Sequence, residues 1–296
     1  MKMPLTPAGL LSRGLYSFSQ AGKKYGAEWY ILLVGLFIVG FMIFMTLFPW
    51  LFTSFDPSDQ NAGPQLAAPG GTHLMGTDNL GRDIWARMVW GAQTILGVAF
   101  AAALISSFIG IPLGLLSGFV GGPLDRVLSL TMDSIYSFPG LILAIAFAAM
   151  MGPGVVNITL AVAVIYIPTY YRLVRGQTIS IREELYVEAA QVLGAKRWTI
   201  LGRYIFPNVI ATTVVVFSVN IADAIMTEAA LSYIGLGLPA GMPDWGMDLS
   251  MGKKFLPSGS WWLITFPGAM IMTLALGFTF LGEGLAEILN PKLLEK

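Results

Sequence analysis

The sequence predicts an all-α integral membrane protein with six transmembrane helices, and three observations lead to this fold class. Of the 296 residues, 55% are hydrophobic and only 11% are charged, whereas soluble domains carry about 25% charged residues. Apolar segments long enough to cross a bilayer occur six times. Lys and Arg gather on alternate connections between these segments.

Composition also excludes several classes of function. The formal net charge is zero, which gives no case for a nucleic-acid partner. The chain has no cysteine and a single histidine, His73, so we expect neither disulfides nor a metal site. No Gly-x-x-x-x-Gly-Lys-Ser/Thr motif is present, so we expect no ATP or magnesium to be bound by this chain through such a loop.

The first membrane crossing is expected within residues 29–52, after a short basic segment at residues 1–28. The twenty residues from Trp29 to Phe48 carry no charge, and they span about 30 Å at 1.5 Å per residue. The run is longer than the core of a secretory signal and lacks a small-residue cleavage site after it. We therefore expect a retained helix.

Residues 53–92 are rich in Gly, Pro, Asn and Asp, which predicts a long loop. Within it, Ile84–Trp90 is expected to form a short amphipathic surface helix. Three charged side chains, Asp78, Arg82 and Asp83, either pair inside the loop or dock another protein. Two glycines near these side chains, Gly76 and Gly81, indicate tight turns.

Residues 93–289 are expected to form a core of five further helices. Most of these segments contain a proline, which removes a backbone hydrogen bond and bends a helix. Such breaks are tolerated in membranes where neighbouring helices or a cavity satisfy the freed groups, so a bundle around a pathway is favoured. Small residues crowd the first segment, as in closely packed helices. The five segments are expected at 93–118, 128–151, 155–174, 205–231 and 261–282.

The distribution of Lys and Arg predicts the orientation. With the N-terminus inside, the inner segments hold thirteen of the seventeen basic residues, as the positive-inside rule requires. Both termini, the segment 182–204 and the tail 290–296 are then cytoplasmic. The loops 53–92 and 233–260 face outward.

Residues 182–204 form the most charged stretch between two apolar segments. Acidic residues come early and basic residues late, which predicts a short helix–turn–helix. Gly194 permits a sharp bend between the two helical pieces. Pro207 is expected to start the fifth span, where its missing N–H costs little.

The spacing in this loop resembles a known family. Glu188-Ala189-Ala190 is followed by three residues, Gly194, nine residues and then Tyr204-Ile205-Phe206-Pro207. ATP-binding-cassette (ABC) importer permeases carry a cytoplasmic loop of the form E-A-A, three residues, G, nine residues, I-x-L-P. Tyr204 and Phe206 replace the two aliphatic residues of that pattern.

A second E-A-A tripeptide in the chain serves as a control. Glu228-Ala229-Ala230 has Ile234 and Met247 at the positions where glycine and proline are needed. We therefore assign no coupling role to it.

Other motifs narrow the resemblance to the C-type subunit of the dipeptide/oligopeptide/nickel branch of these permeases. They are Gly76-Thr77-Asp78, Gly81-Arg82-Asp83, Pro243-Asp244-Trp245-Gly246, Trp261-Trp262, Phe266-Pro267-Gly268 and Asn290-Pro291-Lys292.

The resemblance implies the bundle of a type I ABC importer in a prokaryotic inner membrane. It implies a second permease subunit, often a B-type paralogue forming a heterodimer, and two ATPase subunits that bind ATP and magnesium. It implies an extracytoplasmic binding protein, for which Asp78, Arg82 and Asp83 are docking candidates. Glu188 to Gly194 then form the coupling helix, and this chain is a non-catalytic pore subunit. The resemblance leaves the substrate open among peptides, nickel chelates, glutathione and oligosaccharides.

Intramembrane polar residues supply candidates for the pore. Carboxylates inside a membrane are costly and usually face a cavity or a partner. One hypothesis is that Asp223 and Glu228 line the outer half of the pore and meet the amino end of a peptide, with Tyr166 and Tyr170 also touching substrate. The alternative is structural hydrogen bonding and packing. For Asp133, capping or pairing near the inner face is favoured.

A different class of function is also considered. An ion-coupled secondary transporter would use Asp223, Glu228 and Asp133 as relays and would transport without an ATPase. The E-A-A spacing and the absence of an internal repeat favour the ABC importer subunit.

Overall fold

The computed structural model describes residues 26–239 and 241–288, and within these ranges the regular structure is helical apart from two isolated β-bridges. Five described helices are long and apolar enough to cross a membrane, and a sixth crossing results if one bent pair of helices counts as a single span. The predicted all-α membrane fold is confirmed. The expected tail 290–296 and most of the segment 1–28 lie outside the described residues.

Helix α2 (Ala27–Leu47) is the first crossing, and a short 3-10 turn at Pro49–Leu51 follows it. The next helix, α3 (Ile84–Val120), is 37 residues long and continuous. The prediction of a separate surface helix at Ile84–Trp90 was therefore wrong. Gly91 does not interrupt the helix, because the Trp245 indole packs where a side chain would stand, so tertiary packing outweighs the helix-breaking tendency of glycine.

The predicted span 128–151 is instead two helices. Helix α4 (Gly122–Tyr136) and helix α5 (Gly140–Met151) meet at an angle of 87°. Pro139 stands at the break, where it has no N–H to continue the hydrogen-bond ladder. The bend is sharper than the kink expected from the sequence.

Helix α6 (Val155–Arg182) packs closely along α3. Three glycines of α3 face carbonyl oxygens of α6, and a Cβ on any of them would come within 2.7–2.8 Å of these oxygens. The predicted role of small residues in close helix packing is thus confirmed. The glycines are Gly110, Gly114 and Gly118, and the facing carbonyls belong to Ile167, Tyr171 and Arg175.

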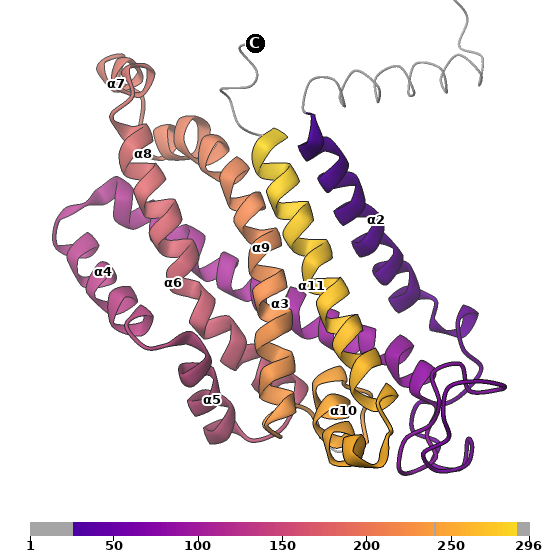
Figure 1. Cartoon of the computed structure of the whole chain (residues 1–296). Helices are drawn as coiled ribbons and strands as arrows, with labels where there is room; N and C mark the ends of the chain where they lie inside the picture. The colour runs from indigo at the N-terminus through magenta and orange to yellow at the C-terminus, as the bar shows by residue number, and fades with distance from the viewer. Residues whose placement is uncertain (1–25, 240, 289–296) are drawn as a thin grey trace, which may run out of the picture.

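Helix α7 (Leu185–Val192) and helix α8 (Arg197–Ile200) form a hairpin that protrudes from one end of the bundle (Figure 1). A π-helical turn, Leu201–Ile205, joins α8 to helix α9 (Phe206–Tyr233), so helical backbone runs from Arg197 to Tyr233. Pro207 lies in the first turn of α9, as predicted, but the helical backbone that precedes it was not predicted. Proline clashes with the carbonyl four residues earlier in an α-helix, and the wider π turn precedes it here.

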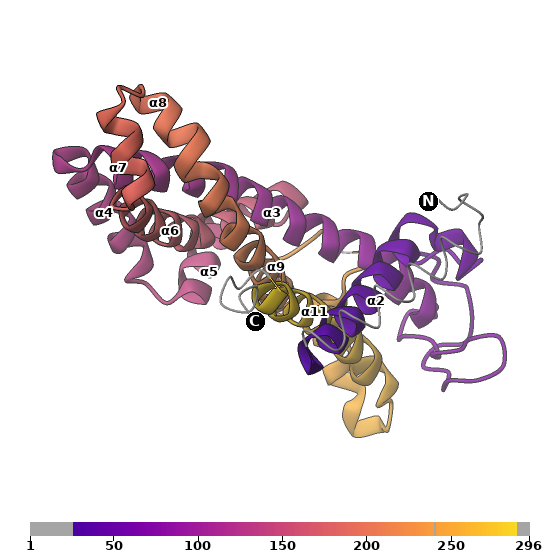
Figure 2. The same ribbon diagram turned by 90° about the horizontal axis from the view of Figure 1, so that it is seen from above.

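Helix α10 (Trp245–Gly252), a 3-10 turn at Lys253–Ser258 and helix α11 (Trp262–Ile288) complete the chain. Helix α11 lies between α2 and α9 (Figure 2). We call residues 185–200 the hairpin, and residues 48–83 with 235–261 the cap. The start of α2 and the end of α11 lie at the hairpin end, and the cap covers the opposite end (Figure 1).

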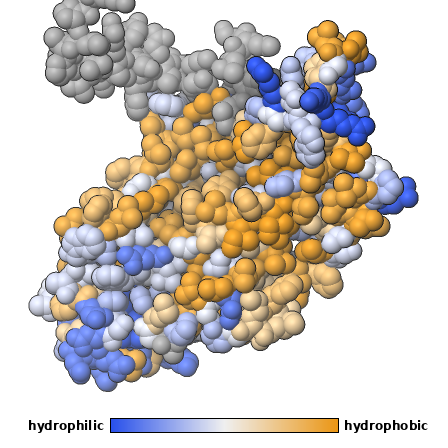
Figure 3. All heavy atoms as spheres, turned by 180° about the vertical axis from the view of Figure 1, so that it is seen from behind, coloured by the Kyte–Doolittle hydropathy of each residue, from blue (hydrophilic) through white to orange (hydrophobic). Residues whose placement is uncertain are grey.

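A broad apolar band lies between the hairpin and the cap, and hydrophilic residues gather at both ends (Figure 3). Two buried hydrophobic clusters hold the fold. The larger runs through the bundle toward the cap, and the smaller joins the hairpin to α3, α6 and α9. The band is what a protein surrounded by lipid requires.

Candidate functional site

The turn of the hairpin is built by Gly194. Its φ of +83° lies in the left-handed region, which glycine adopts without a Cβ penalty. Two hydrogen bonds close the turn, from Gly194 N to Gln191 O at 2.9 Å and from Ala195 N to Ala190 O at 3.0 Å. This pairing is a Schellman motif, so the predicted bend at Gly194 is confirmed.

The inner face of the hairpin is apolar and buried. Val187 and Ala190 of α7 point inward, and Val187 packs with Ile200, Leu201 and Ile205 in the smaller cluster. This cluster extends to Val174 of α6, Val209 of α9 and Leu115 of α3. The hairpin is thus attached to three membrane helices through buried side chains rather than suspended on loops.

The outer face of the hairpin exposes large apolar side chains. Leu193 is 87% exposed, Val192 83%, Leu185 81% and Trp198 74%. Glu188 and Ala189 are exposed as well. An apolar patch on a protruding polar segment is typical of a protein-binding surface. Trp198 was not singled out from the sequence, although a Trp in a charged loop is a signal for an interface.

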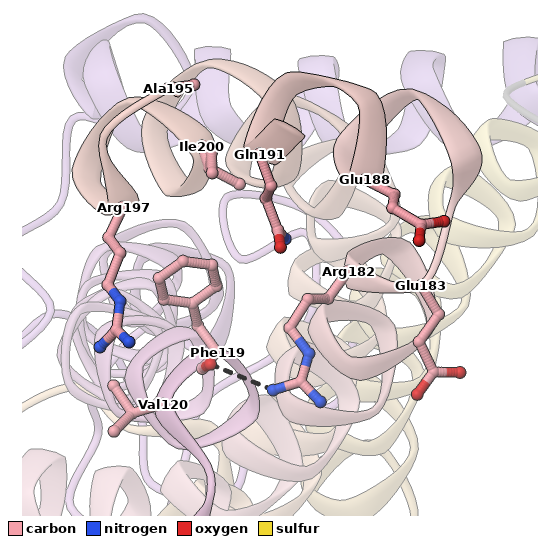
Figure 4. A pocket seen from close by; sticks show the side chains of 9 residues that line it. All are labelled: Phe119, Val120, Arg182, Glu183, Glu188, Gln191, Ala195, Arg197 and Ile200. Atoms are coloured by element: carbon pink, nitrogen blue, oxygen red, sulfur yellow. Dashed lines mark hydrogen bonds between the residues drawn. The ribbon is translucent and has the colours of Figure 1, made fainter. Parts of the chain in front are cut away.

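A pocket of about 740 Å³ lies beneath the hairpin, between α7, α8 and the ends of α3 and α6 (Figure 4). Arg182, in the last turn of α6, donates from Nη1 to the carbonyl of Phe119 at 3.1 Å and to that of Gly118 at 3.3 Å. It thereby caps the C-terminal end of α3, where cations are favoured. Glu183 and Glu188 lie at one side of the pocket and Arg197 at the other (Figure 4).

A polar network fixes α3, α4 and α6 to one another near the hairpin. Arg175 of α6 donates to both oxygens of Asp125 in α4, at 2.5 and 2.7 Å. Ser117 of α3 also donates to Asp125, and Tyr171 lies within hydrogen-bond distance of Ser117 and Ser129. These five residues were not identified from the sequence as a network, because the contacts that join α6 to α3 and α4 link residues 42 to 54 positions apart.

A second pocket, of about 340 Å³, lies at the break between α4 and α5 and is open to the surface of the described chain. Asp223 and Thr227 of α9 and Tyr166 of α6 line it. The hydroxyls of Tyr166 and Thr227 are 3.0 Å apart. The structure therefore brings two of the predicted pore residues, Asp223 and Tyr166, to one cavity.

The structure places the other two pore candidates elsewhere. Tyr170 is fully buried, with its Cβ against Gly110 of α3. Glu228 is 1% exposed and points toward the cap, where its Oε1 is 3.2 Å from Ser232 Oγ. The same hydroxyl donates to Asp244 Oδ2 at 2.6 Å. Neither Tyr170 nor Glu228 lines the pocket of Asp223.

The charged residues of the cap are buried and paired with one another. Arg82 Nε donates to Asp78 Oδ2 at 2.6 Å. Asp83 accepts from the backbone of Ala86 at 2.7 Å and lies 2.8 Å from His73 Nδ1. Their burial corrects the idea that these side chains meet a partner directly: the alternative of pairing inside the loop describes their contacts. Gly76 and Gly81 have φ values of +79° and +77°, which confirms the predicted turns.

A buried ion pair missed by the sequence analysis joins the two halves of the cap. Arg87 of α3 contacts Asp248 of α10 at 2.7 Å and also donates to the carbonyls of Pro57 and Met242, both at 3.0 Å. Burial raises the pKa of Asp248, and the Arg87 guanidinium opposes that shift. The partners are 161 residues apart, so no local pattern indicates them.

Comparison with known proteins places this architecture in a family. Residues 110–295 match the family model described as binding-protein-dependent transport system inner membrane component. The chain is 39% identical to the dipeptide transport system permease protein DppC of Alkalihalophilus pseudofirmus, over 88% of this chain and 86% of the relative.

Other relatives carry related names. The glutathione transport system permease protein GsiD of Pectobacterium atrosepticum is 40% identical over 81% of this chain and 77% of the relative. The oligopeptide transport system permease protein OppC of Bacillus subtilis is 36% identical over 88% of this chain and 85% of the relative. Among solved structures, the inward-facing MetNI methionine ABC transporter contains a chain with a TM-score of 0.54 and 19% identity. The matched region covers 70% of this chain and 97% of the transporter chain, and the similarity is evidence for the fold alone.

Proposed function

We infer that this chain, which belongs to the family of binding-protein-dependent transport system inner membrane components, is a membrane permease subunit of an ABC importer for peptides. The relatives named above are permeases of dipeptide, glutathione and oligopeptide transport systems. The hairpin gives this inference its strongest support, because the E-A-A spacing, the glycine turn and the exposed apolar face occur together in it.

We propose that the hairpin lies in the cytoplasm and docks a partner ATPase. The exposed side chains of Ala189, Val192, Leu193 and Trp198 would enter a groove of that subunit, as an amphipathic helix does. ATP and magnesium would be bound by the ATPases. This proposal is supported by the exposure of the patch and by the positive-inside distribution of Lys and Arg.

The packing of the hairpin indicates how its displacement would reach the membrane helices. Helical backbone is continuous from α8 through the π turn into α9, so a displacement of the hairpin reaches the membrane along one rod. The buried side chains of Val187 and Ile205 hold α7 on the same rod. We propose that ATPase closure tilts this unit and exposes the pathway beside α9 alternately to each side of the inner membrane.

The proposed transport function also implies partners beside this chain and at the cap. A second permease subunit, expected to be a B-type paralogue, would complete the pathway, and an extracytoplasmic binding protein would deliver peptide to the cap. Because Asp78, Arg82 and Asp83 are buried, such a protein would contact exposed cap residues such as Leu74.

Reconstitution tests the function directly. The chain is placed in proteoliposomes with its second permease, the ATPases and the binding protein, and uptake of labelled peptide is measured with and without ATP. We expect uptake that needs ATP, and no ATP hydrolysis by the purified chain alone. Uptake driven by an ion gradient without the ATPases would instead support a secondary transporter and overturn the proposal.

A further inference from the structure

We propose that Asp223, with the aromatic and hydroxyl side chains around it, forms a subsite that binds a primary ammonium group of the substrate during its passage. The inference rests on the proposed function, since it takes the substrate to be a peptide. It adds a specificity-determining residue inside the membrane, away from any binding protein.

The first observation is that Asp223 lacks a partner. Among the described residues it has neither an ion pair nor a hydrogen bond, and its side chain is exposed. Other carboxylates of the bundle differ: Asp125 is held by Arg175, Asp133 lies 3.8 Å from Arg172, and Glu228 is buried beside Ser232. An intramembrane carboxylate without a counter-charge is costly, so it requires water or a cation to face.

The second observation is the depth of this carboxylate. At 1.5 Å per residue, Asp223 lies about 15 Å from the cap end of α9 at Tyr233. Tyr166, which lines the same pocket, lies roughly 17 Å from the cap end of α6 at Val155. Both positions are well inside the apolar band, so contact with water at the membrane surface does not explain the exposed charge.

The third observation is the chemistry of the pocket walls. Tyr136, Phe138 and Tyr166 supply aromatic surface, and Thr169 and Thr227 supply hydroxyl oxygens. No Lys or Arg lines the cavity, so Asp223 gives it a single formal charge, which is negative. Carboxylates, hydroxyl oxygens and aromatic rings all attract ammonium groups.

A neighbouring arginine shows that one of these rings, that of Tyr136, already holds a cation. The Arg172 guanidinium lies 4.6 Å from the centre of the Tyr136 ring, and Arg172 Nε is 3.8 Å from Asp133 Oδ1. An ammonium group bound at Asp223 would be a second cation near the Tyr136 ring. Its counter-charge would be the Asp223 carboxylate, as Asp133 is for Arg172.

The ligand class follows from the number of oxygens. A calcium ion takes six to eight oxygen ligands, whereas the pocket supplies one carboxylate and a few hydroxyls. The described residues contain no cluster of three or more acidic or histidine side chains suited to a metal. In a peptide, an ammonium group is either the amino terminus or a lysine side chain, and the experiment distinguishes these sources.

The experiment uses the fact that the chain has no cysteine. Thr227→Cys places one thiol in the pocket of the complete transporter in proteoliposomes. The modification rates of this thiol by a cationic aminoethyl and an anionic sulfonatoethyl methanethiosulfonate are compared. We expect a preference for the cationic reagent on the order of tenfold, which adding Asp223→Asn abolishes. Thr169→Cys, in the same pocket, repeats the measurement should Thr227→Cys disturb the assembly.

A matched control is Thr72→Cys, because Thr72 is an exposed threonine of the cap. Its reagent preference should not change with Asp223→Asn. Protection is then measured with three peptides: one with a free amino terminus, its N-acetylated form and an N-acetylated peptide containing lysine. We expect the first to protect, the second not to protect, and the third to show whether a lysine side chain is also bound.

The inference fails if the reagent preference at Thr227→Cys persists in Asp223→Asn. It also fails if neither pocket thiol reacts while Thr72→Cys does. Peptide uptake by the wild-type transporter is measured in the same preparation. Normal uptake together with either result would overturn the ammonium subsite and leave the proposed transport function intact.

Discussion

The cap buries charged side chains, whereas the hairpin exposes apolar ones. In the cap, Arg82, Asp83 and Asp248 are buried, and each is paired within the chain, Asp248 with Arg87 at the start of α3. In the hairpin, Leu193 and Trp198 are mostly exposed although they are apolar. The cap therefore completes its own interactions, whereas the hairpin leaves apolar surface for a partner. The two regions should respond differently to substitution.

The largest effect is expected from breaking the buried pair of the cap. Arg87→Ala leaves Asp248 buried without its cation, which costs about 3–5 kcal/mol. We expect the cap to become sensitive to limited proteolysis and the thermal midpoint of the purified transporter to fall. Lys254→Ala, at an exposed position of the same region, should change neither. An unchanged proteolysis pattern in Arg87→Ala would refute the view that this pair holds the cap together.

A smaller, local effect is expected at the turn of the hairpin. Gly194→Val forces a β-branched residue into a left-handed conformation, at a cost of about 1–3 kcal/mol. Open space surrounds the position, so the cost comes from the backbone and not from a clash. We expect ATP-dependent uptake to fall while the membrane helices stay folded.

Two controls sharpen this prediction. Gly194→Asn should be milder, because asparagine tolerates the left-handed region. Gly202→Ala, also in open space but without a positive φ, should be close to wild type. Full uptake by Gly194→Val would show that the geometry of the turn does not matter for coupling.

The smallest effect is expected from pH at the cap. Burial raises the pKa of Asp244, which also accepts from Ser232. A carboxyl with a raised pKa in the folded state contributes stability below its unfolded pKa near 3.8, and this stability is lost as the pH rises through the folded value. We therefore expect resistance of the cap to proteolysis to decline across that range. Asp244→Asn should weaken this dependence, with the remainder coming from Asp248, whose pKa burial also raises. An identical pH profile in the variant would contradict the assignment.

The sequence predicted the membrane fold and the hairpin because both depend on local patterns. Apolar runs define the spans, and the distance from Glu188 to Gly194 defines the turn. The sequence did not predict the continuity of α3 through Gly91, which depends on the indole of Trp245 from far along the chain. The pairing of Arg87 with Asp248 was missed for the same reason.

The same distinction applies to the intramembrane carboxylates. The sequence identified Asp223 and Glu228 as costly charges, yet it gave no means to separate them. They are five residues apart on one helix, so they face different directions. The structure directs Asp223 to an open pocket and Glu228 into the base of the cap. Only the neighbours contributed by α5, α6 and α10 decide between these environments.

The central claim, that the hairpin is the docking surface for an ATPase, is tested most directly by a pair of leucines. Leu193 on the hairpin and Leu74 on the cap are both well exposed, so aspartate at either position should leave the fold intact. The measurement is the affinity of the purified permease complex for its ATPase. We predict that Leu193→Asp weakens it at least about tenfold, as removal of an interface hot spot does, and that Leu74→Asp leaves it unchanged. Equal affinity of the wild type and Leu193→Asp would contradict the account.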